Sequence, residues 1–335
     1  MRAVLPIRPD QPPIPEIGEL PDPVAGHGEA LIRVHATALN RADLLQLRGL
    51  YPPPPGESEV PGLECAGTIE SLGDGDPGPW RVGQRVMALL AGGGQGEKVA
   101  VPLGQLMPIP EGMSFEDAAA LPEAALTAWT NLVAEGGLAP DPAMDGSTEP
   151  PSVLITAAAS GIGTFAVQLA RELGARVLVA GRTMARLERL RPLGADHCIL
   201  LDDGLPDAVR RATDGRGVDL ILELAGGPTL ATRLSALRRR GRLVLVGILA
   251  GTRAEIDLGD MLRRRLQLVG SVLRARPRDE KARLIHAFQT FARGRLADGR
   301  LRPVVDRVVP FEHIAEAYAA MERGGIFGKI VVRVG

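Results

Sequence analysis

The feature that most constrains the fold is an alternation of apolar and amphipathic segments that begins near residue 152. Strand-like apolar segments occur at 153–157, 177–180, 218–222, 243–247 and 266–270. Residues 162–173 and 184–193 instead carry apolar side chains at helical spacing. Strands that are apolar on both faces indicate a parallel sheet covered by helices. We therefore predict a doubly wound α/β domain over residues 125–272.

The first third of the chain has a different pattern, in which short β-rich segments such as 30–34 and 84–88 lie between Gly and Pro turns. Turns at this spacing predict a small β-barrel or sandwich. The tail also ends in a β-rich segment, 327–332, so we expect it to return to the first domain. Two domains agree with a length of 335 residues.

Local patterns predict further elements. Ser114, followed by Asp117, predicts the start of a helix, and residues 282–293 predict another. The segment 51–56 (YPPPPG) can be neither helix nor central strand, so it is a rigid exposed loop. Residues 138–151 are rich in Pro and Asp, lack periodicity and predict a surface loop.

Composition argues against several classes of function. A net charge of −1 and an aromatic content of 3% argue against a nucleic-acid surface. Two cysteines, Cys65 and Cys198, cannot supply a disulfide scaffold or a four-thiolate zinc site. The five histidines have no metal-ligand or triad spacing. Residues 1–6 lack the apolar core of a signal peptide, and no apolar run approaches about 18 residues, so we expect a cytoplasmic protein.

The strongest chemical signal is the turn 158–163 (AASGIG), between the first parallel strand and its helix. It is a degenerate dinucleotide fingerprint, with Ala158 and Ser160 at the first two glycine positions and Gly163 at the last. Small residues let the backbone approach a pyrophosphate, and a helix N-terminus offers free N–H groups. The predicted cofactor-binding residues of this turn are Ser160, Gly161, Ile162 and Gly163. The alternative is that small residues only allow strand and helix to pack closely.

The end of the second strand indicates which dinucleotide binds. NAD sites carry an acidic residue there for the ribose 2′-hydroxyl, and this strand end has none. Arg182, Thr183 and Arg186 can instead hold a 2′-phosphate through charge-assisted hydrogen bonds, which predicts NADPH as the cofactor. The alternative for both arginines is a solvated surface position, because only three of the 39 basic residues are lysines.

Three residues follow later strands of the predicted sheet. Gly226 and Gly247 lie at carboxyl ends of strands, where open α/β sheets bind ligands, although simple turn glycines are the alternative. Arg274 follows the last strand and is either a site residue or a surface residue.

Six short segments carry a resemblance to a known family: 38–43 (ALNRAD), 61–67 (PGLECAG), 121–128 (LPEAALTA), 160–163 (SGIG), 193–196 (LGAD) and 328–329 (GK). Together they resemble the medium-chain dehydrogenase/reductase superfamily, specifically its zinc-free quinone oxidoreductases of the ζ-crystallin type. The resemblance covers nearly the whole chain from Gly28. It implies a mainly-β, GroES-like catalytic domain formed by residues 1–124 and 273–335, and a Rossmann NADPH-binding domain formed by residues 125–272.

The alcohol dehydrogenases of this superfamily hold catalytic zinc with a Cys, a His and a later Cys or acid. By resemblance, these places hold Asn40, Leu63 and Glu123 here. Leucine has no lone pair to donate, and one Asn with one Glu cannot supply the ligands of a tetrahedral zinc ion. We therefore expect no bound metal. A quinone accepts a hydride without a Lewis acid. The resemblance therefore implies an NADPH:quinone oxidoreductase.

Site residues follow from this resemblance. We expect Tyr51, on the proline-rich loop, to line the acceptor site and donate a hydrogen bond or proton to the quinone oxygen; its alternative is a packing aromatic. Asn40 is expected to bind the cofactor ribose or the substrate, and Asp43 to orient Asn40 or nearby backbone. The resemblance also implies that Thr127 and Lys329 contact the cofactor.

Two other functions stay open at this point. The same fold and cofactor could reduce an activated C=C bond in an enone or enoyl thioester. The chain could also be a non-catalytic NADPH-binding protein with a regulatory or RNA-binding role, although its charge weighs against RNA. As partners we expect a small electron-poor acceptor, no nucleic acid, no membrane, and a second copy of the chain, because homodimers are common in this family.

Overall fold

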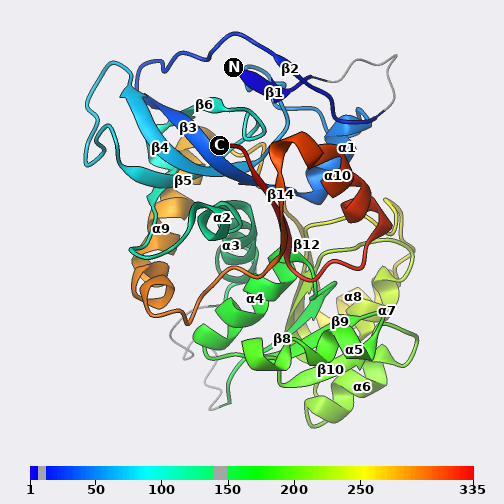
Figure 1. Cartoon of the computed structure of the whole chain (residues 1–335). Helices are drawn as coiled ribbons and strands as arrows, with labels where there is room; N and C mark the ends of the chain where they lie inside the picture. Colours follow the sequence, from blue (N-terminus) through cyan, green and yellow to red (C-terminus); the bar gives the residue numbers. More distant parts are fainter. Residues whose placement is uncertain (7–12, 139–148) are drawn as a thin grey trace. The chain divides into compact units, whose positions relative to one another are not determined.

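The computed structural model describes residues 1–6, 13–138 and 149–335, so most of the predicted loop 138–151 lies outside the described residues. Its contacts divide the chain into two units. Unit 1 comprises Met1–Leu126 and Leu273–Gly335, and unit 2 comprises Thr127–Val272. Figure 1 draws most of unit 2 in green to yellow.

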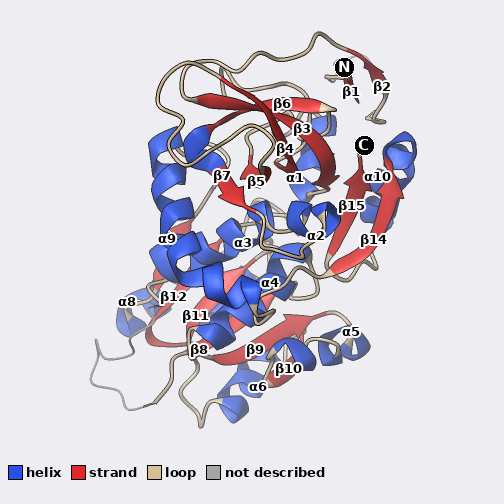
Figure 2. Ribbon diagram, turned by 60° about the vertical axis from the view of Figure 1, so that its left-hand side comes forward, coloured by secondary structure: helices blue, strands red, loops and turns tan. Residues whose placement is uncertain are grey.

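Unit 2 is built on a sheet of six parallel strands in the order β10-β9-β8-β11-β12-β13 (Figure 2). The strands are β8 (Ser152–Thr156), β9 (Arg176–Gly181), β10 (His197–Leu200), β11 (Val218–Glu223), β12 (Leu237–Leu245) and β13 (Gln267–Gly270). This order confirms the predicted doubly wound sheet, and its direction reverses between β8 and β11, where such sheets bind ligands. Strand β10 was not predicted from the sequence, because four residues give too short a pattern.

The helices of unit 2 connect these strands. They are η2 (a π-helix, Thr130–Ala134), α4 (Gly161–Glu172), α5 (Met184–Glu188), η3 (a 3₁₀ turn, Arg191–Leu193), α6 (Leu205–Ala212), α7 (Leu230–Ser235) and α8 (Leu258–Arg264). The predicted helix 162–173 is confirmed as α4. The predicted helix 184–193 is too long, because Pro192 has no backbone N–H to donate to a continuing helix.

Unit 1 contains a seven-stranded sheet with the path β14-β15-β3-β4-β5-β7, and β6 pairs with β3 beside this path. The strands are β3 (Glu29–Ala38), β4 (Glu64–Leu72), β5 (Arg85–Leu89), β6 (Lys98–Pro102), β7 (Leu106–Pro108), β14 (Val305–Pro310) and β15 (Lys329–Arg333), with a separate pair β1 (Arg2–Val4) and β2 (Ile17–Glu19). Because β15 lies antiparallel to β3, with Val331 opposite Ala38, the tail returns to the first domain as its composition predicted.

The helices of unit 1 are α1 (Arg41–Leu47), η1 (Leu103–Gln105), α2 (Phe115–Ala119), α3 (Pro122–Trp129, at the junction with unit 2), α9 (Arg278–Ala297), η4 (Phe311–His313) and α10 (Ile314–Arg323). Ser114 caps α2 as predicted, since its Oγ accepts from Asp117 N at 3.0 Å. The predicted helix 282–293 is confirmed as part of α9. The helix starts earlier, at Arg278, because Asp279 and Glu280 in its first turn interact favourably with the positive end of the helix dipole.

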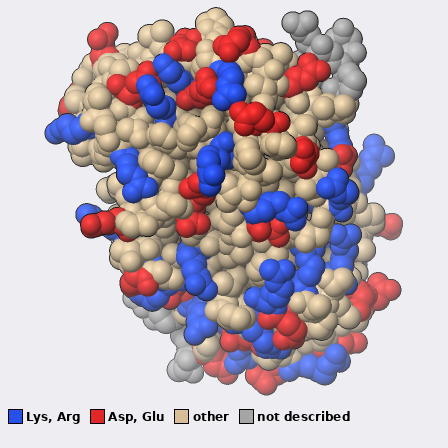
Figure 3. All heavy atoms as spheres, in the orientation of Figure 1, with Lys and Arg blue, Asp and Glu red and all other residues tan. Residues whose placement is uncertain are grey.

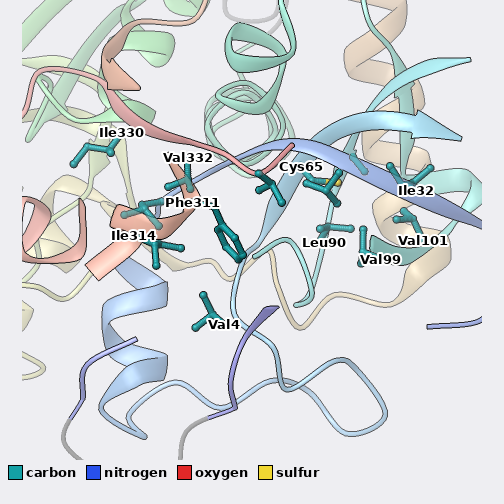
Figure 4. Close-up of a cluster of buried hydrophobic side chains, with 14 of the residues drawn as sticks. Val4, Ile32, Cys65, Leu90, Val99, Val101, Phe311, Ile314, Ile330 and Val332 are labelled. Carbon is teal, nitrogen blue, oxygen red and sulfur yellow. The ribbon is translucent and has the colours of Figure 1, made fainter. Parts of the chain in front are cut away.

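The core of unit 1 joins segments from both ends of the chain (Figure 4). Val4 from β1 and Ile32 from β3 belong to the same buried cluster as Phe311 and Val332. Burying these apolar side chains together therefore ties the C-terminal tail to the N-terminal strands. On the face drawn in Figure 3, basic and acidic side chains are interspersed. Among the described residues, no helix has the length and apolarity needed to cross a membrane.

Candidate functional site

The turn after β8 leads directly into the N-terminus of α4 in unit 2. Ser160 caps α4, its Oγ accepting from Gly163 N at 3.1 Å. The N–H groups of Gly161 and Ile162 lie in the first turn of α4, where no intrahelical acceptor precedes them. A Cβ on Gly163 would lie 2.5 Å from the Ala158 carbonyl oxygen, so only glycine fits there. The Gly163 contact supports the close-packing interpretation of the turn, while pyrophosphate binding at the free N–H groups stays a prediction.

Beyond the end of β9, the predicted 2′-phosphate residues lie near one another. Arg182 and Thr183 are exposed, and Thr183 begins α5 without using its side chain as a cap. Arg186 is half-buried on α5. The Arg182 guanidinium has no hydrogen bond or ion pair within the part of the chain that the structure describes. An exposed cation of this kind is available to a phosphate.

The loops after β11 and β12 pack against each other through their glycines. Gly226 has a φ of +65°, and a Cβ there would lie 2.8 Å from the Gly247 carbonyl oxygen. A Cβ on Gly247 would lie 2.3 Å from the Leu224 carbonyl oxygen. These contacts explain glycine at both positions, whether or not a ligand also lies there.

A buried ion pair, which the sequence analysis missed, supports the loop after β11. Glu223 Oε2 lies 2.7 Å from Arg233 Nε, with side chains 0% and 3% exposed. The other oxygen, Oε1, accepts from Ala225 N at 2.8 Å and Gly226 N at 2.9 Å. Glu223 therefore fixes the backbone that leads into Gly226. The sequence shows an acid at a strand end and an arginine on a helix, but nothing in it pairs them.

In unit 1, three predicted site residues meet in one buried polar cluster, which we call the Lys329 cluster: Asn40, Asp43, Glu64 and Lys329. Lys329 Nζ donates to Asn40 Oδ1 at 2.6 Å and to Glu64 Oε1 at 2.5 Å. Asn40 Nδ2 donates to the same Glu64 oxygen at 2.8 Å. Both ends of the Asn40 amide are thus engaged within the protein. Glu64 was not predicted as a site residue, although it belongs to the family segment 61–67.

Asp43 completes this cluster from the first turn of α1. Its Oδ2 accepts from Asn40 N at 2.7 Å, which matches the predicted orienting role. Its Oδ1 is buried and has no hydrogen-bond partner among the described residues. Burial raises the pKa of Asp43 to about 6, against the opposing effects of the Asn40 N–H and the Lys329 charge.

The residues at the family's zinc places do not fit a zinc ion. Asn40 Oδ1 already accepts from a lysine ammonium, and Leu63 is an apolar side chain 2% exposed. Glu123 alone supplies a charged oxygen at these places. This donor set lacks the nitrogen and sulfur ligands that zinc prefers. Within the described ranges, no group of three or more His, Cys, Asp and Glu side chains is arranged to hold a metal.

Tyr51 is half-buried on the proline-rich loop of unit 1. Its ring lies 5.1 Å from the guanidinium carbon of Arg274. Burial and the Glu123 carboxylate raise the pKa of Tyr51, while Arg274 opposes them, so the phenol is protonated at neutral pH. Arg274 itself is buried, so a surface role is wrong. Thr127 is buried on α3, and its carbonyl accepts from Asn131 Nδ2 at 2.7 Å.

Comparison with known proteins identifies the family. Residues 26–111 match the alcohol dehydrogenase GroES-like domain, and residues 161–290 match the zinc-binding dehydrogenase family. A quinone oxidoreductase from Thermus thermophilus, solved also with NADPH, is 35% identical over 100% of both chains, with a TM-score of 0.82. The chain belongs to the medium-chain dehydrogenase/reductase family.

Other members of the medium-chain dehydrogenase/reductase family are also similar to this chain. An NAD-dependent alcohol dehydrogenase of known structure is 29% identical over 100% of both chains, with a TM-score of 0.84. The synaptic vesicle membrane protein VAT-1 homolog of Mus musculus is 29% identical over 92% of this chain and 77% of its own length. Family membership assigns unit 1 as the GroES-like domain and unit 2 as the Rossmann-type NAD(P)-binding domain.

Proposed function

We propose that this protein is an NADPH-dependent quinone oxidoreductase that transfers a hydride to a quinone without a metal. The observation that carries the proposal is the donor set in unit 1, where Lys329 engages Asn40 and a leucine stands at the second zinc place. An enzyme without a Lewis acid needs an acceptor that is already electron-poor, and a quinone is one. Similarity to the Thermus thermophilus quinone oxidoreductase supports the same reaction.

NADPH, when bound, supplies the hydride. The N–H groups at the start of α4, where Gly163 lets the helix pack against Ala158, would hold its pyrophosphate. Arg182, Thr183 and Arg186 would hold its 2′-phosphate, and Gly226 and Gly247 would border it at the carboxyl ends of their strands. We further assign Thr127 and Lys329 as cofactor contacts, as the family resemblance implies.

In unit 1, Tyr51 would donate a hydrogen bond to the acceptor oxygen as negative charge develops on it. A protonated phenol with no internal hydrogen-bond partner among the described residues is free for this role. Asn40 and Asp43, predicted from the sequence as catalytic, would be positioning residues. Because both ends of the Asn40 amide are engaged, these two residues would act by fixing the backbone around the site.

The direct test is a steady-state assay of the purified protein with a quinone and an enone side by side, each with NADPH and with NADH. We expect quinone turnover, with a higher kcat/KM for NADPH than for NADH. Turnover of the enone alone would assign the protein to the reductases of activated C=C bonds. NADPH binding without turnover of either acceptor would instead favour a regulatory or RNA-binding protein.

We also propose that the protein forms a homodimer through β13. This strand is one edge of the unit 2 sheet, so its outer backbone groups have no strand partner among the described residues. Apolar side chains are exposed along it and on the preceding helix α8, with Leu258 70%, Leu262 79% and Leu268 37% exposed. A second copy of the chain could pair with this edge and cover these side chains.

A further inference from the structure

Arg274 is a buried cation that binds only neutral groups. In the chain it follows β13 and precedes α9, and the residue is 4% exposed. Its Nε donates to the Ala91 carbonyl at 2.7 Å, and one terminal nitrogen donates to the Tyr51 carbonyl at 2.9 Å. The other terminal nitrogen donates to Gln46 Oε1 at 2.7 Å. It forms no ion pair within the described part of the chain, so its charge is not neutralised by direct contact.

These contacts hold the proline-rich loop at its first residue and the chain just beyond its end. Arg274 binds the carbonyl of Tyr51, where the loop begins. Gln46, fixed by Arg274, donates from its Nε2 to the Glu59 carbonyl at 3.0 Å, three residues beyond the end of the loop. The planar guanidinium can direct several N–H groups at fixed angles, which a lysine ammonium does not reproduce. Arg274 therefore anchors this rigid loop, directly at Tyr51 and through Gln46 at Glu59.

The same guanidinium lies against the Tyr51 ring, with its carbon 5.1 Å from the ring centroid. A cation at this distance is attracted by the ring and stabilises negative charge on the phenol oxygen. Burying such a charge without a direct carboxylate partner is costly. Burial lowers the pKa of Arg274, whereas Tyr51 and the carboxylates of Asp43, Glu123 and Glu57 oppose this shift. Arg274 therefore keeps a positive charge against the Tyr51 ring.

We propose that Arg274 is a positioning residue for Tyr51, because it fixes the loop that carries Tyr51 and keeps a positive charge against its phenol ring. This inference rests on the proposed function, in which Tyr51 donates a hydrogen bond to the acceptor. Arg274 acts through Tyr51 and is not itself assigned a contact with the acceptor.

The chain allows the contact to be tested without activity, because it has only two tyrosines. The other, Tyr318, is buried, donates to Gln95 Oε1 at 2.8 Å, and has a pKa raised well above its usual value by burial. In protein labelled with ¹³C at the tyrosine Cζ, the resonance absent from Tyr51→Phe identifies Tyr51. Its titration can then be followed by NMR in each variant.

Opposite shifts are expected from the two charges near Tyr51. Arg274→Met should raise the pKa of Tyr51 by about 0.5–1 unit, whereas Glu123→Gln should lower it. Arg274→Lys, which keeps the charge, should leave the pKa near that of the wild type. The control Arg283→Gln removes an exposed arginine from α9 and should cause no shift. An unchanged Tyr51 titration in folded Arg274→Met would overturn the inference.

Kinetics then test whether Arg274 acts through Tyr51. Arg274→Met and Arg274→Lys should both lower kcat for the quinone at least tenfold, because both lose the guanidinium fork that holds the loop. In the Tyr51→Phe background, Arg274→Met should change kcat less than twofold. Equal losses in both backgrounds would overturn the inference. Full kcat in Tyr51→Phe would instead disprove the proposed donor role of Tyr51, while the titration still decides whether Arg274 positions the phenol.

Discussion

Lys329 and Glu64 form a buried ion pair, with Nζ 2.5 Å from Oε1 and side chains 5% and 0% exposed. The second carboxylate oxygen, Oε2, accepts from the backbone N–H of Glu123 at 2.8 Å. Each charge is therefore compensated by the other, and the carboxylate is hydrogen-bonded on both oxygens. Because the pair also engages the Asn40 amide, it fixes the orientation of that amide in the Lys329 cluster.

Breaking this pair should strongly destabilise the protein. Glu64→Gln or Lys329→Met leaves one buried charge without its partner, which should lower the free energy of unfolding by about 3–5 kcal/mol. The double variant should lose less than the sum of the two single variants, because it buries no unpaired charge. Urea unfolding measures all three. As a control, Arg283→Gln removes one partner of an ion pair whose side chains are 71% and 70% exposed, and should cost less than about 1 kcal/mol.

The raised pKa of Asp43 should make stability depend on pH. The pKa is about 6 in the folded protein, above the ordinary value of 3.8, so the folded state binds this proton more tightly. The stabilisation is complete below the lower value and is lost as pH rises through about 6. Between pH 5 and pH 7, this group should reduce the free energy of unfolding by about 1 kcal/mol.

Asp43→Asn provides the comparison, because the amide oxygen can still accept from Asn40 N. Urea unfolding at several pH values should show a smaller decrease from pH 5 to pH 7 in this variant than in the wild type. Subtracting the two curves removes the contribution of histidines that titrate in the same range. Identical pH dependence in both proteins would mean that Asp43 is ionised throughout this range.

The parts of the fold that follow from local patterns could be predicted from the sequence. Apolar segments predicted the strands β8, β9, β11 and β13 and the last three residues of β12, and the Ser114 cap predicted the start of α2. The first part of β12 was missed, because its residues 238–242 are mostly arginines. Small residues after β8 indicated the turn with the Ser160 cap. In each case the physical cause lies within a few neighbouring residues. The length of helix α5 was overestimated because the effect of Pro192, which is also local, was not considered.

The polar partners could not be predicted in this way, because tertiary structure selects them. Lys329 and Glu64 are 265 positions apart, and Arg274 and Tyr51 are 223 apart. A charged side chain in the sequence gives no indication of its partner when that partner lies on a distant strand. The role of an arginine also depends on whether the folded protein buries its side chain. Arg274 and Arg233 are buried, whereas Arg182 is exposed, and nothing in the three residue types distinguishes them.

The Glu223–Arg233 pair should affect both stability and cofactor binding. Arg233→Met leaves the Glu223 carboxylate buried without its cation, so the free energy of unfolding should fall by about 3–5 kcal/mol. The loop that contains Gly226 should then move, and the Kd for NADPH should rise about tenfold if this costs about 1.4 kcal/mol of binding. NADPH fluorescence titration measures Kd. A stability loss with an unchanged Kd would place this loop outside the cofactor site.

The proposed dimer should depend on the apolar side chains beside β13. Leu262→Asp places a charge at a position that is 79% exposed in the single chain, so the monomer should remain folded. Burying that carboxylate in an interface would be costly, and the variant should elute as a monomer in size-exclusion chromatography with light scattering. Val24→Asp, at an 84% exposed position in unit 1, should remain a dimer. A wild-type protein that is monomeric at micromolar concentration would exclude this interface.

Arg182 should determine the preference for NADPH. Removing its guanidinium in Arg182→Ala eliminates a charge-assisted hydrogen bond to the 2′-phosphate, which should cost about 1.5–3 kcal/mol. The KM for NADPH should therefore rise about tenfold or more, whereas the KM for NADH, which lacks that phosphate, should change less than twofold. Arg211→Ala, which removes an exposed arginine from α6 in the same unit, controls for the loss of surface charge. Equal changes in both KM values would show that Arg182 does not contact the 2′-phosphate.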